Sequence, residues 1–129
     1  MKILNNLFLL RFAIAVILIM HGVPSIVSGD VNAFGNIYLR EQGFGSFGLP
    51  LAWAIKASHV AGAICLLLNK YIKPVAVITI FILLIGIFMV HLKDGWYVVG
   101  GGNNGVEFNF LLIFSLLTLL FPGLTIKKY

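Results

Sequence analysis

Five ionisable side chains lie within or beside long apolar stretches of this sequence: His21, Lys56, His59, His91 and Glu107. Such groups are costly to bury in a membrane-spanning helix, so those that occur there usually serve a function. Lys56 and His59 are three residues apart and therefore share one face of a helix. A cluster of these groups can bind a polar head group and move protons, because histidine titrates near neutral pH.

Four of these residues also have a simpler explanation, whereas His59 is predicted to lie deeper and among small residues. His21 and His91 suit the lipid head-group region, and Lys56 is long enough to extend its ammonium group there. Glu107 could serve only at the N-terminus of a helix, where a carboxylate is favoured. We favour one shared site, because the predicted topology places all five groups at a similar depth in the membrane.

Other kinds of chemistry have weaker support. Gly100, Gly102 and Gly105 match the G-x-G-x-x-G pattern of nucleotide-binding loops, but no strand precedes them, so we interpret them as a flexible loop. Cys65 is the only cysteine, which excludes an internal disulfide or redox pair and indicates a packing role. Three histidines and a glutamate could bind zinc, copper or haem, but no pair has the usual ligand spacing. We therefore expect no metal and no covalently bound cofactor.

The composition indicates that lipid surrounds the elements that carry these groups. Of the 129 residues, 60% are hydrophobic and 10% are charged, and the mean hydropathy is +1.06. Soluble domains have about a quarter of their residues charged. The net charge of +5 is not gathered in a dense patch, which argues against nucleic acid as a partner. The length fits a single membrane domain over residues 1–129.

The apolar runs predict an all-α polytopic membrane protein. Its four transmembrane helices form a bundle and are expected near residues 7–23, 49–68, 75–92 and 106–121. The fourth run is short for a crossing unless its flanks contribute. The first run also resembles a signal peptide with a small-residue cleavage site at residues 27–29, but Arg11 stands early in it, so we interpret it as a helix.

The distribution of lysine predicts the orientation of these helices. Lysines concentrate at both termini and between the second and third helices: Lys2, Lys70, Lys73, Lys127 and Lys128. Charges on the opposite face nearly cancel. We therefore expect both termini on the cytoplasmic side of the inner (cytoplasmic) membrane. Arg11 lies within one or two turns of that side and is expected to extend toward it.

The first extracytoplasmic loop, residues 24–50, is too long to lack secondary structure. Asp30 is the expected N-cap of a helix, and Gly43 can end it. Apolar residues between them recur at helical spacing. We predict a short interfacial helix on the extracytoplasmic surface, which could form a lid.

This topology brings the five ionisable groups toward the extracytoplasmic side. His21 and His91 end the first and third helices there. Lys56 and His59 lie in the outer half of the second helix, and Glu107 lies in the first turn of the fourth. The candidates for catalysis are His59, Glu107 and His21, and those for substrate binding are Lys56, His91, Trp96 and Asn109.

Four short motifs carry a family resemblance. They are Arg11 with His21-Gly22, the run His91-Leu92-Lys93-Asp94-Gly95-Trp96, the run Val98-Val99-Gly100-Gly101-Gly102, and Gly105-Val106-Glu107-Phe108. Together they resemble the DoxX family over nearly the whole chain. The family-typical positions are Arg11, His21, Gly22, His91, Gly95 and Glu107. The resemblance implies a small four-helix membrane protein, with relatives associated with thiosulfate:quinone oxidoreduction or with redox complexes that counter oxidative or thiol stress.

One departure from the family concerns the second helix, where members often carry an acidic residue before a Gly-Gly pair. This chain has Ser58-His59-Val60-Ala61-Gly62 instead, so any role of that acid is absent or has passed to His59. We therefore expect an accessory subunit of a redox complex in which the extracytoplasmic cluster binds a quinone head group, with a hydrogen bond from His59 or His21 to its carbonyl. Glu107 would exchange the proton, and a flavin, haem or thiol partner would supply the electrons.

Two other functions remain open from the sequence. The chain could bind or transport a small polar molecule or a lipid, or it could be a scaffold for partner enzymes. Its expected partners are the lipid bilayer, a redox protein and, as a candidate homo-oligomer, a second copy of the chain.

Overall fold

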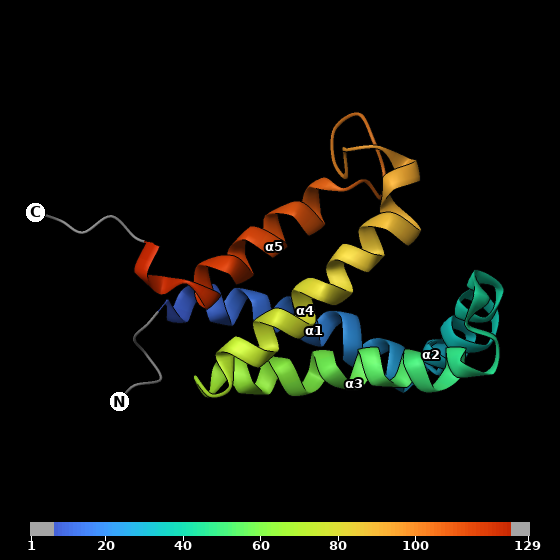
Figure 1. Cartoon of the computed structure of the whole chain (residues 1–129), viewed down its shortest axis with the longest axis horizontal. Coiled ribbons are helices and arrows are strands. Elements are labelled where there is room, and N and C mark those ends of the chain that lie inside the picture. Colours follow the sequence, from blue (N-terminus) through green and yellow to red (C-terminus); the bar gives the residue numbers. More distant parts are fainter. Residues whose placement is uncertain (1–6, 125–129) are drawn as a thin grey trace, which may run out of the picture. The chain divides into compact units, whose positions relative to one another are not determined.

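Residues 7–124 are described in the computed structural model of this chain, and every regular element among them is a helix (Figure 1). The predicted all-α fold is therefore confirmed. The chain divides into two compact units, Met1–Lys70 and Tyr71–Tyr129. That both belong to one membrane domain stays a prediction. Lys2, Lys127 and Lys128, on which the predicted orientation partly depends, lie outside the described residues.

The first unit is a helical hairpin with a shorter helical segment at its connection. The helices α1 (Phe8–Ser28) and α3 (Gly48–Leu67) run side by side in opposite directions (Figure 1). Between them lie the short helix α2 (Asp30–Ala33), the π-helix η2 (Phe34–Phe44) and the 3₁₀ turn η3 (Gly45–Phe47). We call α2 and η2 together the cover segment.

The cover segment is the predicted helix of the first long loop, but it begins differently from the prediction. Gly29, with φ of 82°, is the N-cap, and Asp30 is the first helical residue, so Asp30 as N-cap is wrong. Glycine adopts this left-handed backbone at little cost, which allows the sharp turn from α1 into α2. Gly43, with φ of 105°, interrupts the helical geometry near the predicted end.

Glycines set how closely the elements of the first unit pack. A Cβ added to Gly22 of α1 would lie 2.8 Å from Val60 Cγ2 and 3.2 Å from the main-chain oxygen of Lys56 in α3. A Cβ added to Gly35 of η2 would lie 2.6 Å from Leu49 Cα. Small residues at such crossings allow helix backbones to approach closely. Both α1 and the cover segment therefore rest directly on α3.

The second unit is also a helical hairpin. The helix α4 (Ile72–Gly86) continues through the π-helix η4 (Ile87–His91) into the 3₁₀ turn η5 (Leu92–Asp94). After a loop, α5 (Glu107–Leu120) returns beside α4, and the 3₁₀ turn η6 (Pro122–Leu124) follows it. The loop between η5 and α5 carries several of the candidate site residues.

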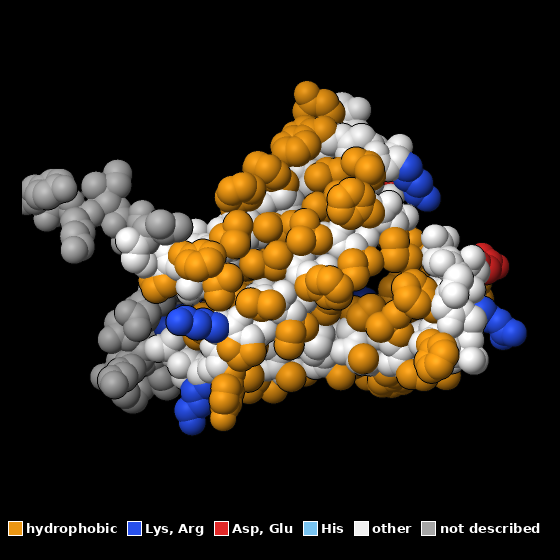
Figure 2. Space-filling view, in the orientation of Figure 1, with side chains coloured by type: hydrophobic (Ala, Val, Ile, Leu, Met, Phe, Trp, Pro, Cys, Tyr) orange, Lys and Arg blue, Asp and Glu red, His pale blue; other side chains and the backbone are white. Residues whose placement is uncertain are grey.

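Three helical stretches are long and apolar enough to cross a membrane: Phe8–Ser28, Asp30–Leu67 and Ile72–Asp94. Apolar side chains cover much of the visible surface in Figure 2, and Leu9 and Phe88 are 80% and 73% exposed, as side chains in contact with lipid would be. The helix α5 has 14 residues, a length of about 21 Å at 1.5 Å per residue, against a hydrocarbon core of about 30 Å. It is therefore the shortest of the four predicted spans.

Candidate functional site

Lys56 is held between three elements of the first unit. Its Nζ donates a hydrogen bond of 3.1 Å to the main-chain oxygen of His21 in α1. The same nitrogen lies 5.5 Å from the centre of the Phe34 ring in η2, a cation–π distance. The side chain is half-buried. The ammonium group is thus fixed where α1, η2 and α3 meet.

His59 is one helical turn further along α3 and is the most deeply buried of the three histidines. Its side chain is 8% exposed, and its Nδ1 is buried without a hydrogen-bond partner among the described residues. The Cβ of His59 lies beside Gly22, because a Cβ added to that glycine would be 3.6 Å from it. His21 precedes this glycine, and its own side chain is exposed.

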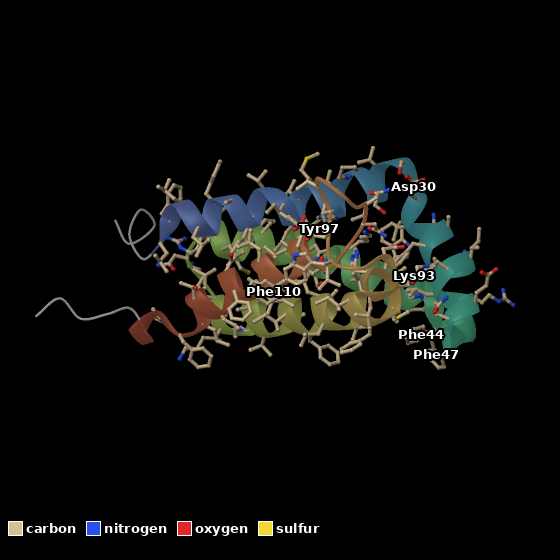
Figure 3. All side chains as sticks on the ribbon, turned by 90° about the horizontal axis from the view of Figure 1, so that it is seen from above. Asp30, Phe44, Phe47, Lys93, Tyr97 and Phe110 are labelled. Carbon is tan, nitrogen blue, oxygen red and sulfur yellow. The ribbon has the colours of Figure 1, made fainter. Side chains whose placement is uncertain are left out.

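The cover segment is attached to α3 close to these groups. Trp53 Nε1 of α3 donates a hydrogen bond of 3.0 Å to Asn32 Oδ1 of α2. Within the cover segment, the rings of Phe34 and Tyr38 stack with their centres 5.7 Å apart. In η3, which follows the cover segment, Phe47 projects outward and is 76% exposed (Figure 3). Asn32 and Trp53 were not among the predicted site residues, since nothing in the sequence pairs side chains on two separate elements.

Arg11 does not extend to the surface as predicted. Its side chain is 1% exposed, and Nη1 donates a hydrogen bond of 2.6 Å to the main-chain oxygen of Leu66, near the C-terminus of α3. The guanidinium also lies 5.6 Å from the centre of the Phe8 ring. A cation is favourable at a helix C-terminus, where main-chain oxygens point outward. Arg11 therefore ties α1 to the end of α3 opposite the cover segment.

In the second unit, Glu107 orders the loop that precedes α5. Its Oε1 accepts hydrogen bonds from the main-chain nitrogens of Val98 at 2.8 Å and Val99 at 3.1 Å. In addition, the main-chain nitrogen of Glu107 donates to the oxygen of Trp96 at 2.9 Å. One residue thus makes both side-chain and main-chain contacts across the loop.

The loop between η5 and α5 has no regular secondary structure but contains several internal hydrogen bonds, and its flexibility stays a prediction. His91 Nδ1 lies 2.8 Å from the main-chain oxygen of Asn104, and a carbonyl only accepts, so the ring carries hydrogen on Nδ1. Asn104 Nδ2 donates to Asp94 Oδ2 at 3.0 Å. A Cβ added to Gly105 would lie 2.5 Å from the main chain of Trp96. Glycine is needed there for this close approach.

The remaining candidates for substrate binding make internal contacts in the second unit. Asn109 is 6% exposed and donates from Nδ2 to the main-chain oxygen of Leu83 at 3.2 Å, which joins α5 to α4. Trp96 packs edge-on against Phe110, with ring centres 5.2 Å apart, and is 46% exposed. A half-exposed indole ring suits the membrane interface.

The candidate residues fall into two groups, one in each unit. His21, Lys56 and His59 are neighbours in the first unit. His91, Trp96, Glu107 and Asn109 belong to the second, around the loop and the start of α5. A single cluster of all seven stays a prediction. No group of three histidine, cysteine or acidic residues that could hold a metal ion occurs within residues 7–124.

The long apolar helices define the class of the protein, an α-helical membrane protein. The family model named DoxX matches residues 6–92, about two thirds of the sequence. The chain therefore belongs to the DoxX family and is an integral membrane protein. The matched part includes Arg11, the His21-Gly22 pair, His59 and His91, and it ends before Glu107. Comparison with curated proteins and with solved structures found no match.

Proposed function

We propose that this chain is an accessory membrane subunit of a redox complex and that its first unit binds the head group of a membrane quinone. The observation that carries the proposal is the imidazole ring of His59, which is buried with Nδ1 unpaired among the described residues. A buried polar atom without a partner costs about 1–3 kcal/mol. A ligand that supplies the missing hydrogen bond recovers this free energy on binding.

A quinone has suitable chemistry for this position. With hydrogen on Nδ1, His59 donates to a quinone carbonyl, and in the other tautomer Nδ1 accepts from a quinol hydroxyl. Reduction of a quinone to a quinol takes up two electrons and two protons, and histidine is suited to pass a proton near neutral pH. The single cysteine of the chain provides no dithiol, so a partner protein with a flavin, haem or thiol pair supplies both electrons.

The other candidate residues have supporting roles in this proposal. Lys56 and Gly22 position α1 and the cover segment around His59. Glu107 orders the loop before α5, because its Oε1 already accepts two main-chain hydrogen bonds. The complex is placed in the cytoplasmic membrane with both termini of this chain in the cytoplasm, as the lysine distribution favours.

The test is the quinone content of the full-length protein after purification in a mild detergent. We expect the wild type to retain quinone, and His59→Leu, which keeps the volume and removes the nitrogens, to retain at least about tenfold less. His91→Leu is the matched control, since that ring is already bonded to Asn104.

Equal retention by the wild type and His59→Leu would contradict quinone binding at this site. A wild type that takes up no quinone, even when a soluble short-chain quinone is supplied, would contradict the function as a whole. Flux of a polar solute or lipid in liposomes would then support transport, and its absence would support a scaffold.

A further inference from the structure

The positively charged ammonium group of Lys56 has no acidic partner among the described residues of the first unit. Asp30 and Glu41 are the acidic residues between Met1 and Lys70, and no ion pair joins either of them to Lys56 within the described part of that unit. The contacts of Nζ are the main-chain oxygen of His21 and the Phe34 ring. Both partners are uncharged, so they orient the ammonium group, and no described residue of the first unit compensates its charge.

Lys56 and its hydrogen-bond partner His21 both lie well inside one end of the hairpin. Lys56 lies about eight residues after the start of α3, and His21 lies about two turns before the end of α1. Both therefore lie roughly 10–12 Å inside that end of the hairpin, at 1.5 Å per residue. The ammonium group is held there by the main chain of the neighbouring helix α1, in a hydrogen bond that remains exposed.

A cation at such a depth is costly unless an anion accompanies it. Two of the three ammonium hydrogens of Lys56 are free for further acceptors, because Nζ makes one hydrogen bond within residues 7–124. The side chain is half-buried, so a ligand can reach it.

We propose that Lys56 binds a phosphate-type anion and that, in the membrane, the phosphate of an anionic phospholipid occupies this place. Charge-assisted hydrogen bonds from an ammonium group to phosphate are among the stronger ones in proteins. Basic pockets between transmembrane helices bind anionic lipid head groups in other proteins, on the matrix or cytoplasmic side; here the same chemistry is proposed at the other end of the hairpin. The site is separate from the quinone proposal, because it depends on Lys56 and the anion and requires no redox partner.

The experiment compares full-length wild type with three variants in phosphatidylcholine nanodiscs, with and without phosphatidylglycerol. Lipid retained after extraction into detergent is counted by native mass spectrometry. Lys56→Met removes the charge, Lys56→Arg keeps it, and Lys70→Met makes the same change at an exposed lysine of the same unit. We expect Lys56→Met to retain at least about tenfold less phosphatidylglycerol than wild type, and the other two variants to retain it.

A second arm distinguishes a lipid from a free anion. The unfolding temperature in phosphatidylcholine alone is measured with sodium phosphate and with sodium chloride at equal ionic strength. Stabilisation of the wild type by phosphate that is lost in Lys56→Met, without preferential retention of phosphatidylglycerol, would identify a soluble anion as the ligand.

Two results would overturn the proposal. One is that the wild type prefers neither phosphatidylglycerol nor phosphate. This result is measured on the wild type alone, so it does not depend on whether a variant folds. The other is the same preference in wild type and Lys56→Met. Loss of quinone in His59→Leu with lipid retention unchanged would leave the anion site standing, so the two proposals fail separately.

Discussion

Glu107 holds the loop before α5 through a carboxylate oxygen that accepts hydrogen bonds from two successive main-chain nitrogens. Hydrogen bonds to a charged acceptor are worth about 1.5–3 kcal/mol each when shielded from water, and less when exposed. Val98 is half-buried and Val99 is exposed, so the two bonds are partly shielded.

We expect Glu107→Ala to lower the free energy of unfolding in detergent by about 2 kcal/mol, because both main-chain donors lose their acceptor. Glu107→Gln keeps a carbonyl acceptor and should cost about half as much. Hydrogen exchange at the Val98 and Val99 amides should accelerate in Glu107→Ala. Glu41→Ala, at an exposed carboxylate, is the control, and unchanged exchange at both amides would show that Glu107 does not order the loop.

The cover segment is joined to α3 by an approach of two glycines. A Cβ on Gly48 would clash with the main-chain oxygen of Gly35, and a Cβ on Gly35 would lie 2.9 Å from the main-chain oxygen of Gly48. Backbone cannot move aside as a flexible side chain can. Two neighbouring contacts depend on this approach of the cover segment to α3: the hydrogen bond between Asn32 and Trp53, and the cation–π contact between Lys56 and Phe34.

Gly48→Ala should therefore displace the cover segment and destabilise the first unit by about 1–3 kcal/mol, as overpacking does in other proteins. The measurement is unfolding in detergent, together with exchange of the Trp53 indole hydrogen, which should become faster. Gly101→Ala is the control, since a Cβ there meets nothing within 4 Å and the residue has no positive φ. Equal stability of Gly48→Ala and wild type would mean that the segment packs less closely than described.

At the scale of the molecule, the number of crossings decides which ends of the helices face the same side. Three stretches are long enough to span, and α5 is shorter. The α3–α4 connection and the loop before α5 lie at the two ends of the stretch Ile72–Asp94, so they face opposite sides of the membrane if that stretch crosses it. Whether α5 also crosses decides the side on which α5 ends. The lysines of that connection favour its cytoplasmic location.

Single cysteines test this arrangement in a background with Cys65→Ser. Pro74→Cys should react with an impermeant maleimide only from the cytoplasmic side, and Gly101→Cys only from the extracytoplasmic side; both positions are exposed. Labelling is compared in intact cells and in inverted vesicles. Reaction of both cysteines from the same side would rule out the predicted topology.

The sequence by itself determined the helices and the ionisable groups within them. Apolar runs separated by short polar or glycine-rich segments predict spans, because lipid requires main-chain hydrogen bonds to be satisfied within each segment. The prediction was wrong in local details. Gly29, with a left-handed backbone conformation, is the N-cap of α2 in place of the predicted Asp30. Spacing along one helix also sufficed to place Lys56 and His59 on one face.

Only the tertiary structure decided what these groups contact. Arg11 bonds to Leu66, Lys56 to His21 and Trp53 to Asn32, in each case between elements far apart in sequence. The acceptors are mostly main-chain oxygens, which every residue has, so no residue type in the sequence marks them. Which main-chain oxygen a side chain bonds to depends on which part of the backbone the fold brings within hydrogen-bond distance. Close helix packing, such as that at Gly22, decides this.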